Sequence, residues 1–291
     1  EASSFLFEKG KYKEPRVEDF KGKDELDESF YDDIKTHNFI YPKLSKGSKT
    51  ILKYKESIKD PRFLSPFYFG NFMPIVNNKV IIIADKEISL RFKEFNTNDI
   101  SINFNKKEKR GQIIYTWELN DIEKYEYEEN VPTYKSVLPH IIPIINSYKF
   151  DGKNVKVLEN VSDLYAWYYS LVKDLNKNES DEKLVKLVAQ LTSDKETDLE
   201  KVKAIYYWTQ NNIKYIDYEY SLGGFIPRDA NIVFKKKYGD CKDNSSILMQ
   251  MLEIAGLVGN LTWVGTRSIP YPYEDVPTPI VDNHMILSYK Y

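Results

Sequence analysis

The sequence has a single cysteine, Cys241, among 291 residues. One cysteine cannot form an intramolecular disulfide, so no internal disulfide stabilises the fold. For the same reason the cysteine content does not identify the redox compartment of the protein. Long apolar runs are also missing. The longest, residues 80–84 and 141–145, fall far short of the about 20 residues that span a bilayer. We therefore expect no integral membrane segment in this chain.

Net charge is also small, because 42 Lys and Arg nearly balance 44 Asp and Glu. No continuous basic stretch is available to follow a phosphate backbone, so we expect no nucleic-acid partner. Among the three histidines, His37 and His140 have no partner at metal-ligand spacing and are better interpreted as surface or packed residues. One Cys and one His cannot complete a tetrahedral zinc site, so we predict no metal and no cofactor.

The first part of the chain has the pattern of β-strands. Short β-branched or aromatic segments, often alternating, are separated by Asn, Asp, Lys and Gly at residues 50–58, 79–85, 88–95, 100–105 and 111–119. This spacing predicts an antiparallel β-sandwich. The continuous apolar run after Asn77 and Asn78 favours a strand that is buried on both faces.

After about residue 157 the apolar period changes from two to nearly four. Helices are predicted between residues 161 and 175, with Ser162 as a candidate cap, and at about 181–191. Another begins at Thr197, where Glu200 three residues later would complete a capping box. We therefore predict two domains, residues 1–157 and 158–291.

Cys241 is predicted to open a further helix. Asp240 is a favourable N-cap, and Asp243 can return a hydrogen bond to the backbone of the cap. Apolar residues then recur at helical spacing until Gly256. A helix start favours a thiolate, although the two aspartates oppose it, so an imidazolium would have to provide the counterweight. The alternative is that Cys241 is a small buried apolar residue.

A strand-like segment at residues 279–291 carries His284, with Met285, Leu287 and Tyr289 alternating against His284, Ile286 and Ser288. A cysteine on a helix followed by a histidine on a strand is the order of a thiol–imidazole pair in papain-like folds. This order favours a catalytic role for Cys241 over the apolar one.

The segment KYGDCKDNSSILMQMLEIAGL resembles the Cys segment of the bacterial transglutaminase-like superfamily, and DNHMILSY resembles its His strand. Residues 38–75 and 115–134 are similar to the β-sandwich domain of unknown function that often precedes such cores. The resemblance implies an α+β chain: an N-terminal antiparallel β-sandwich, then a papain-like, transglutaminase-like core of helices and a small antiparallel sheet.

The same resemblance implies that Cys241 is the nucleophile and His284 its base. An oxyanion hole would add the backbone N–H of Cys241 and a side-chain donor, for which Tyr218 and Tyr220 are candidates by position. The family's orienting Asp or Asn follows the His by about fifteen residues, so we expect it beyond Tyr291, in a longer protein. Asp282 is predicted to lie on the His284 strand, too close to replace that residue.

The preferred function is a thiol-dependent amide hydrolase, similar to a cysteine peptidase or amidase, that acts on a peptide or protein amide. The alternatives are a protein-glutamine transglutaminase that uses the same pair, and a catalytically inactive transglutaminase-like binding or scaffold protein of the cell envelope. The family context implies a periplasmic or envelope location, although no signal peptide is visible at the start of the sequence. The oligomeric state is not predicted.

Overall fold

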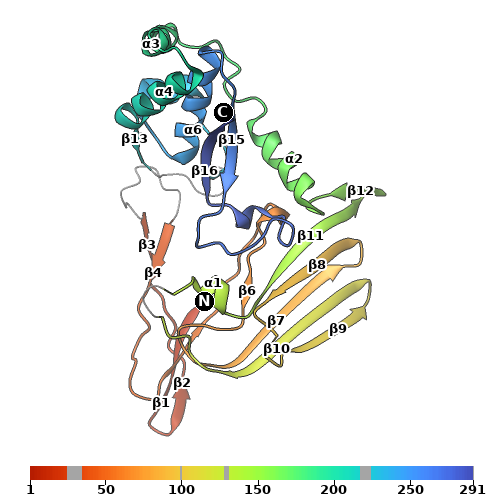
Figure 1. Ribbon diagram of the computed structural model, residues 1–291. Coiled ribbons are helices and arrows are strands. Elements are labelled where there is room, and N and C mark those ends of the chain that lie inside the picture. The colour runs from red at the N-terminus through yellow and green to blue at the C-terminus, as the bar shows by residue number, and fades with distance from the viewer. Residues whose placement is uncertain (25–34, 99, 128–130, 217–223, 291) are drawn as a thin grey trace. The chain divides into compact units, whose positions relative to one another are not determined.

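The computed structural model describes residues 1–24, 35–98, 100–127, 131–216 and 224–290 (Figure 1). The chain forms two compact units, each made of two stretches of sequence. The first unit contains Glu1–Ser57 and Ser180–Met251, and the second contains Ile58–Glu179 and Leu252–Tyr291. Because such a division need not coincide with folding domains, the boundary near residue 157 stays a prediction.

An antiparallel β-sandwich forms most of the second unit, as the sequence predicts (Figure 1). One sheet has the strand order β7-β10-β9; in the other, β11 pairs with β12, β6 and β8. Phe69, Val80, Trp117 and Ile141 are buried in the shared core. The strands are β6 (Phe67–Tyr68), β7 (Ile75–Asp85), β8 (Ile88–Phe95), β9 (Asn103–Lys109), β10 (Gln112–Ile122), β11 (His140–Phe150) and β12 (Lys153–Lys156).

The burial predicted for β7 is wrong for one of its faces. Val80 and Ala84 are buried, but Ile81 and Ile83 between them remain 54% and 58% exposed. The reason is that successive side chains of a strand point to opposite faces of the sheet, and only the face with Val80 and Ala84 meets the opposite sheet. A continuous apolar run alone therefore overstated how much of this strand is covered.

His140 is fully buried on β11, consistent with a packed residue. Its Nδ1 lies 2.7 Å from the carbonyl oxygen of Leu138, and its Nε2 lies 2.9 Å from the hydroxyl of Tyr271. A carbonyl only accepts, so Nδ1 donates and Tyr271 donates to Nε2 when the ring is neutral. Burial lowers the pKa of His140 and favours that neutral form.

Among the described residues, the second unit also contains the C-terminal hairpin, helix α2 and three short helical segments. β15 (Gly259–Val264) pairs antiparallel with β16 (His284–Tyr289). Helix α2 (Val161–Val172) is capped by Asn160, whose side chain accepts from the N–H of Asp163, so the predicted Ser162 cap is wrong by two positions. The remaining segments are α1 (Tyr134–Val137) and the 3-10 turns η1 (Pro61–Phe63) and η3 (Pro279–Val281).

The first unit contains the strands that begin the chain and the helices of the predicted core. Its strands are β1 (Ala2–Glu8), β2 (Lys11–Lys13), β3 (Lys21–Asp24), β4 (Lys35–Asn38), β5 (Lys49–Leu52), β13 (Lys214–Tyr215) and β14 (Tyr238–Gly239). Its helices are α3 (Glu182–Thr192), α4 (Asp198–Asn212), α5 (Ala230–Lys236) and α6 (Cys241–Ile254), which runs on into the second unit.

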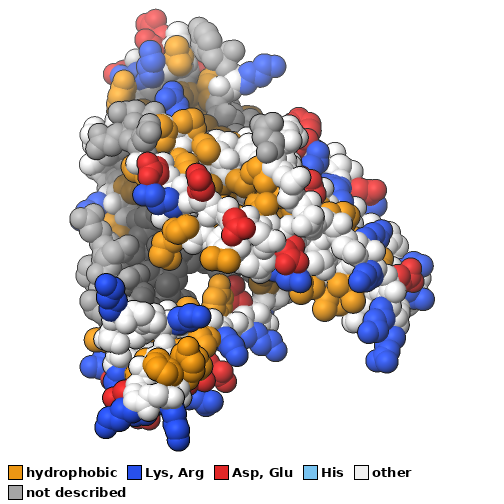
Figure 2. Space-filling model, turned by 90° about the horizontal axis from the view of Figure 1, so that it is seen from below, with side chains coloured by type: hydrophobic (Ala, Val, Ile, Leu, Met, Phe, Trp, Pro, Cys, Tyr) orange, Lys and Arg blue, Asp and Glu red, His pale blue; other side chains and the backbone are white. Residues whose placement is uncertain are grey.

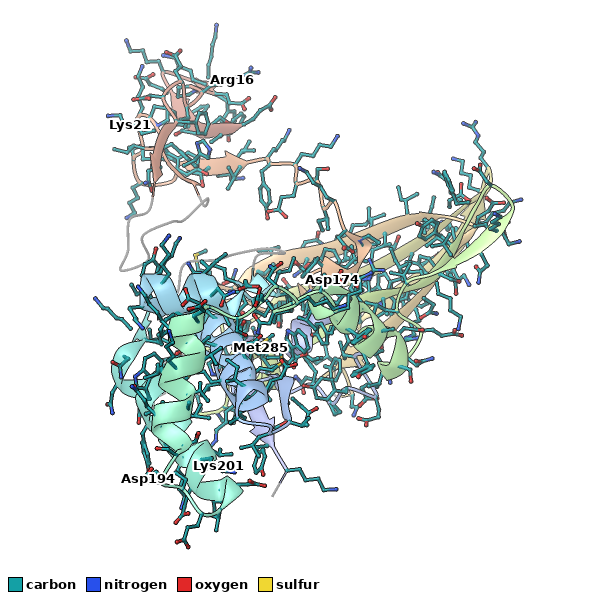
Figure 3. All side chains as sticks on the ribbon, turned by 90° about the horizontal axis from the view of Figure 1, so that it is seen from above. Arg16, Lys21, Asp174, Asp194, Lys201 and Met285 are labelled. Carbon is teal, nitrogen blue, oxygen red and sulfur yellow. The ribbon has the colours of Figure 1, made fainter. Side chains whose placement is uncertain are left out.

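Helix α4 begins with the predicted capping box. The Thr197 hydroxyl accepts from the N–H of Glu200, whose carboxylate accepts from the N–H of Thr197. Asp194 and Lys201 lie near this end of the helix, where Lys201 pairs with Asp198 at 3.3 Å (Figure 3). This part of the core is therefore specified locally.

The surface carries mixed charge, and basic and acidic side chains are interspersed on the face shown in Figure 2. This agrees with the near-equal numbers of the two kinds. Among the described residues, none of the helices combines the length and the apolar character needed to cross a bilayer.

Candidate active site

Cys241 is the first residue of α6, as the sequence predicts, and it is half-buried. Asp240 Oδ1 accepts hydrogen bonds from the backbone N–H groups of Lys242 (3.0 Å) and Asp243 (3.2 Å). Asp243 Oδ2 accepts in return from the N–H of Asp240 at 3.2 Å. These reciprocal bonds form a capping box that fixes where the helix, and with it the thiol, begins.

The carboxylate of Asp243 is held by Arg228, a residue with no predicted role. The guanidinium donates from Nη2 and Nε to Asp243 Oδ2 at 2.7 and 3.0 Å, and the Arg228 backbone N–H donates to Oδ1 at 2.8 Å. Asp243 is 1% exposed. Such charge-assisted bonds are strong when buried, so they anchor the loop before α5 to the start of α6.

Asp240 has its own cationic partner, because the Nζ of Lys242 forms an ion pair with its Oδ2. Both side chains are buried. Burial raises the pKa of Asp240, and the positive charge of Lys242 opposes that rise. Each aspartate beside Cys241 is therefore matched by a cation. The two acids therefore oppose a thiolate at the helix start less than their negative charges alone would.

Gly239 makes the close approach of these groups possible. It lies on β14, which pairs in parallel with β13, and a Cβ placed on it would be 2.4 Å from the Cβ of Asp243. No side chain fits at that separation without displacing Asp243. The glycine of the Gly-Asp-Cys sequence is thus required by packing.

The rest of α6 anchors the cysteine in the core. Ile247 and Met251 are fully buried, and Ser246 donates to the backbone oxygen of Arg228 at 2.7 Å. The helix stops as predicted, since Gly256 has a φ of +77° and the N–H of Leu257 bonds the oxygen of Leu252. Contacts at the start, middle and end of α6 therefore fix the position of the helix that carries the thiol.

His284 is the first residue of β16 and pairs with Val264 of β15. It is half-buried, whereas its neighbour Met285 is 3% exposed and Ile286 is exposed. Because strand side chains alternate, His284 belongs to the less covered face of the hairpin. Cys241 lies in the first unit and His284 in the second, and their pairing stays a prediction.

Asp282 does not lie on the His284 strand, contrary to expectation. It follows the 3-10 turn η3 and precedes β16, and it is 6% exposed. Its Oδ2 accepts from the Tyr168 hydroxyl at 2.5 Å and its Oδ1 from the Tyr273 hydroxyl at 2.6 Å. Neither contact was predicted from the sequence: Tyr168 lies 114 positions before Asp282 and Tyr273 lies nine positions before it.

The remaining site predictions concern the oxyanion hole. Tyr218 and Tyr220 lie outside the described residues, so their role stays a prediction. In the described part of the chain, no group of three or more His, Cys, Asp and Glu side chains could hold a metal ion.

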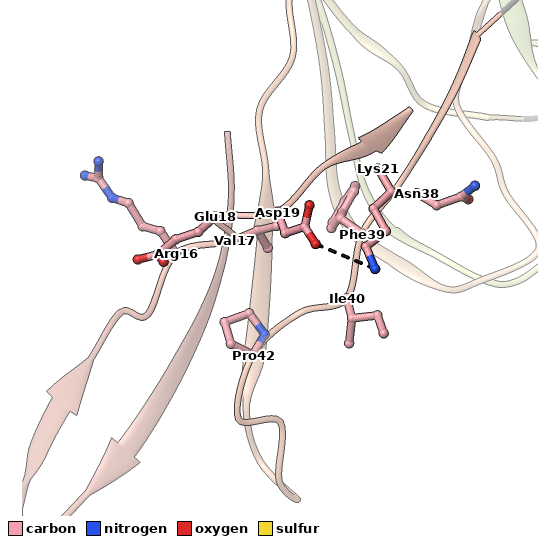
Figure 4. A pocket seen from close by; sticks show the side chains of 9 residues that line it. All are labelled: Arg16, Val17, Glu18, Asp19, Lys21, Asn38, Phe39, Ile40 and Pro42. Carbon is pink, nitrogen blue, oxygen red and sulfur yellow. Dashed lines mark ion pairs between the residues drawn. The ribbon is translucent and has the colours of Figure 1, made fainter. Parts of the chain in front are cut away.

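A cavity of about 570 Å³ lies in the first unit (Figure 4). Its lining includes Arg16, Phe39 and Ile40, together with Asp19 and Lys21, which form an exposed ion pair of 3.8 Å. None of the predicted site residues lines it, so its size alone does not make it the site.

Comparison with known families identifies both parts of the chain. Residues 185–258 match the Transglutaminase-like superfamily, and residues 9–126 match DUF3857, a domain of unknown function with a solved structure. The chain thus combines a transglutaminase-like core, which includes Cys241, with an N-terminal DUF3857 domain. The resemblance predicted from the motifs is confirmed. No curated protein matches the chain.

One of the similar solved structures supports the fold. A putative protease from Parabacteroides distasonis ATCC 8503 is similar with a TM-score of 0.68 at 16% identity, over 99% of this chain and 54% of that chain. This chain therefore spans about half the length of that protein. A putative cysteine protease from Cytophaga hutchinsonii is similar at 14% identity with a TM-score of 0.31, over 78% of this chain and 68% of that chain. The α+β architecture, strand-rich and then transglutaminase-like, is confirmed.

Proposed function

We propose that the protein is a thiol-dependent amide hydrolase in which Cys241 is the nucleophile and His284 the general base. His284 removes the thiol proton, and the sulfur attacks the amide carbonyl carbon. The C–N bond breaks as His284 returns the proton to the leaving amine. Water, deprotonated by the same imidazole, then attacks the thioester, releasing the carboxylic acid and the thiol. A peptide is the substrate class that fits this chemistry.

The observation that carries the proposal is the charge balance around Cys241. Backbone N–H groups and the helix dipole favour an anion at the first turn of α6. Lys242 and Arg228 compensate the two nearby aspartates, so their negative charges oppose that preference less. The match to the transglutaminase-like superfamily, which covers this segment, supports the same chemistry.

Alkylation by iodoacetamide as a function of pH tests the pair. We expect Cys241 to react well below neutral pH in the wild type, and to lose that reactivity in His284→Ala. A thiol with an ordinary pKa of about 8.5 would react only near pH 8 or after unfolding. His37→Ala is the matched control, because His37 is exposed and should leave the profile unchanged. If wild type and His284→Ala were alkylated with the same pH dependence, the assignment of a thiolate–imidazolium pair would be wrong.

Turnover distinguishes hydrolysis from transfer. The full-length natural protein would be incubated with a glutamine-containing peptide and a peptide amide, each with and without an added primary amine. Hydrolysis predicts release of acid and amine that the added amine does not divert into a new amide. Incorporation of the amine would instead establish a transglutaminase. No turnover of either substrate by a folded protein would favour the binding or scaffold alternative. Full activity in Cys241→Ser would show instead that Cys241 is not the nucleophile.

A further inference from the structure

A second cavity, of about 240 Å³, lies within the second unit between α2 and β15. Its lining includes Tyr165 and Tyr168 of α2, Trp263 of β15, and Tyr273 and Asp282. Pockets for drug-sized ligands measure about 300–1,000 Å³, so this one suits a group the size of a side chain. None of its lining residues belongs to the Cys241–His284 pair.

The carboxylate of Asp282 is the charged group of this cavity. Its hydrogen bonds come from the hydroxyls of Tyr168 and Tyr273. No Lys, Arg or His forms an ion pair with it in the part of the chain that the structure describes. A buried carboxylate without a counter-charge is costly, and two acceptor positions remain after two hydroxyl bonds. The site therefore favours a ligand that brings a positive charge and N–H donors.

The walls of the cavity suit the same kind of ligand. The Tyr168 ring stacks on the Trp263 indole with centroids 4.5 Å apart and planes 6° from parallel, and Tyr165, 70% exposed, stands at the opening. Aromatic faces attract organic cations, and tryptophan does so most strongly. The indole Nε1 of Trp263 is buried and has no hydrogen-bond partner among the described residues. A ligand with an acceptor beside its cation could satisfy it.

We propose that this cavity binds an organic ammonium group, with Asp282 as its counter-charge and Tyr165, Tyr168 and Trp263 as its aromatic walls. Two sources present that chemistry: a lysine side chain, whose ammonium ends an apolar stem, and a peptide N-terminus, whose ammonium adjoins a carbonyl oxygen. The proposal does not depend on Cys241, so Cys241→Ser is expected to bind as the wild type does.

Titration of the full chain, followed by the indole N–H signal of Trp263 in ¹⁵N NMR spectra, tests the proposal; the signal is assigned with Trp263→Phe. The probes are n-butylammonium for the lysine source and alaninamide for the peptide terminus, with n-butanol as the neutral isostere, all at constant ionic strength. A saturable shift is expected with at least one ammonium probe, at an affinity about tenfold or more above that of n-butanol. Comparable affinities for n-butylammonium, alaninamide and n-butanol would show an apolar pocket and overturn the assignment.

Variants locate the site. Asp282→Asn should reduce ammonium affinity about tenfold or more, because it removes the charge and keeps the shape. Tyr165→Ala is a second variant, at an exposed position where no buried group is changed, with an expected loss of about two- to fivefold. Tyr169→Ala is the matched control: it lies on the same helix, is 58% exposed and does not line the cavity. Equal losses in Tyr165→Ala and Tyr169→Ala, or unchanged binding in a folded Asp282→Asn, would refute the site.

Discussion

Buried carboxylates are stabilised in different ways at the start of α6 and at Asp282. Beside Cys241, Asp240 pairs with Lys242 and Asp243 with Arg228, so each acid meets a full positive charge. Asp282 meets two tyrosine hydroxyls, which donate hydrogen bonds and carry no charge. Burial raises the pKa of Asp240 and of Asp282, but a cation opposes the rise only at Asp240.

This difference shows that satisfying hydrogen bonds and compensating charge are separate requirements. In the first region each carboxylate forms an ion pair with a cation. Removing one member of a pair therefore takes away the charge that balances the other. In the second region a proton or a ligand can neutralise the carboxylate, so removing its charge leaves no uncompensated charge behind. The two regions should therefore respond to the same Asp→Asn change in different ways.

The largest effect is expected for Asp240→Asn. Asparagine caps a helix about as well as aspartate, so the change isolates the lost charge. Lys242, 2% exposed, would lose the carboxylate with which it forms an ion pair. We expect the free energy of unfolding to fall by about 3–5 kcal/mol. Urea denaturation followed by circular dichroism measures it.

Lys201→Ala is the control for that experiment. It removes an ion pair with Asp198 that is partly exposed, and such pairs contribute less than about 0.5 kcal/mol. If Asp240→Asn were no more destabilising than Lys201→Ala, the view that the start of α6 depends on compensated charge would be wrong.

Gly239→Ala should have an intermediate effect. The new methyl group would collide with the Cβ of Asp243 and push its carboxylate away from Arg228. Overpacking of this kind costs about 1–3 kcal/mol, which thermal or urea unfolding would resolve. Gly22→Ala is the matched control, because a Cβ there meets only ordinary contacts with His37 at 3.7 Å. Similar stabilities for the two variants would contradict the close approach described for Gly239.

Local signals in the sequence were sufficient for the helix starts and stops. Thr197 with Glu200 and Asp240 with Asp243 are each three residues apart, and Gly256 follows the last turn of α6. Such caps depend on neighbours within one turn, so a single sequence contains the information. The exception is α2, where Asn160 caps the helix and Ser162 does not.

Contacts between distant segments were not predictable from the sequence. Arg228 precedes Asp243 by 15 positions, and Tyr168 precedes Asp282 by 114. No pattern in one sequence identifies which of several arginines or of 23 tyrosines reaches a given carboxylate. The exposure of Ile81 and Ile83 was missed for a related reason, because it depends on which face of the sheet the opposite sheet covers.

The smallest effect is expected for Asp282→Asn, which we predict to change the free energy of unfolding at neutral pH by less than about 1 kcal/mol, because the amide oxygen can still accept a tyrosine hydrogen bond.

The pH dependence of the free energy of unfolding is more informative. Burial raises the pKa of Asp282 above its ordinary value of 3.8, so the folded protein holds this proton more tightly than the unfolded chain does. As the pH rises from below 3.8 through the folded pKa, the unfolded chain ionises first and the wild type loses stability. Asp282→Asn lacks this loss. Urea unfolding of both proteins across this range should therefore show the stability of wild type relative to Asp282→Asn falling as the pH increases, and a difference that stayed constant would mean that Asp282 carries its charge in the fold without penalty.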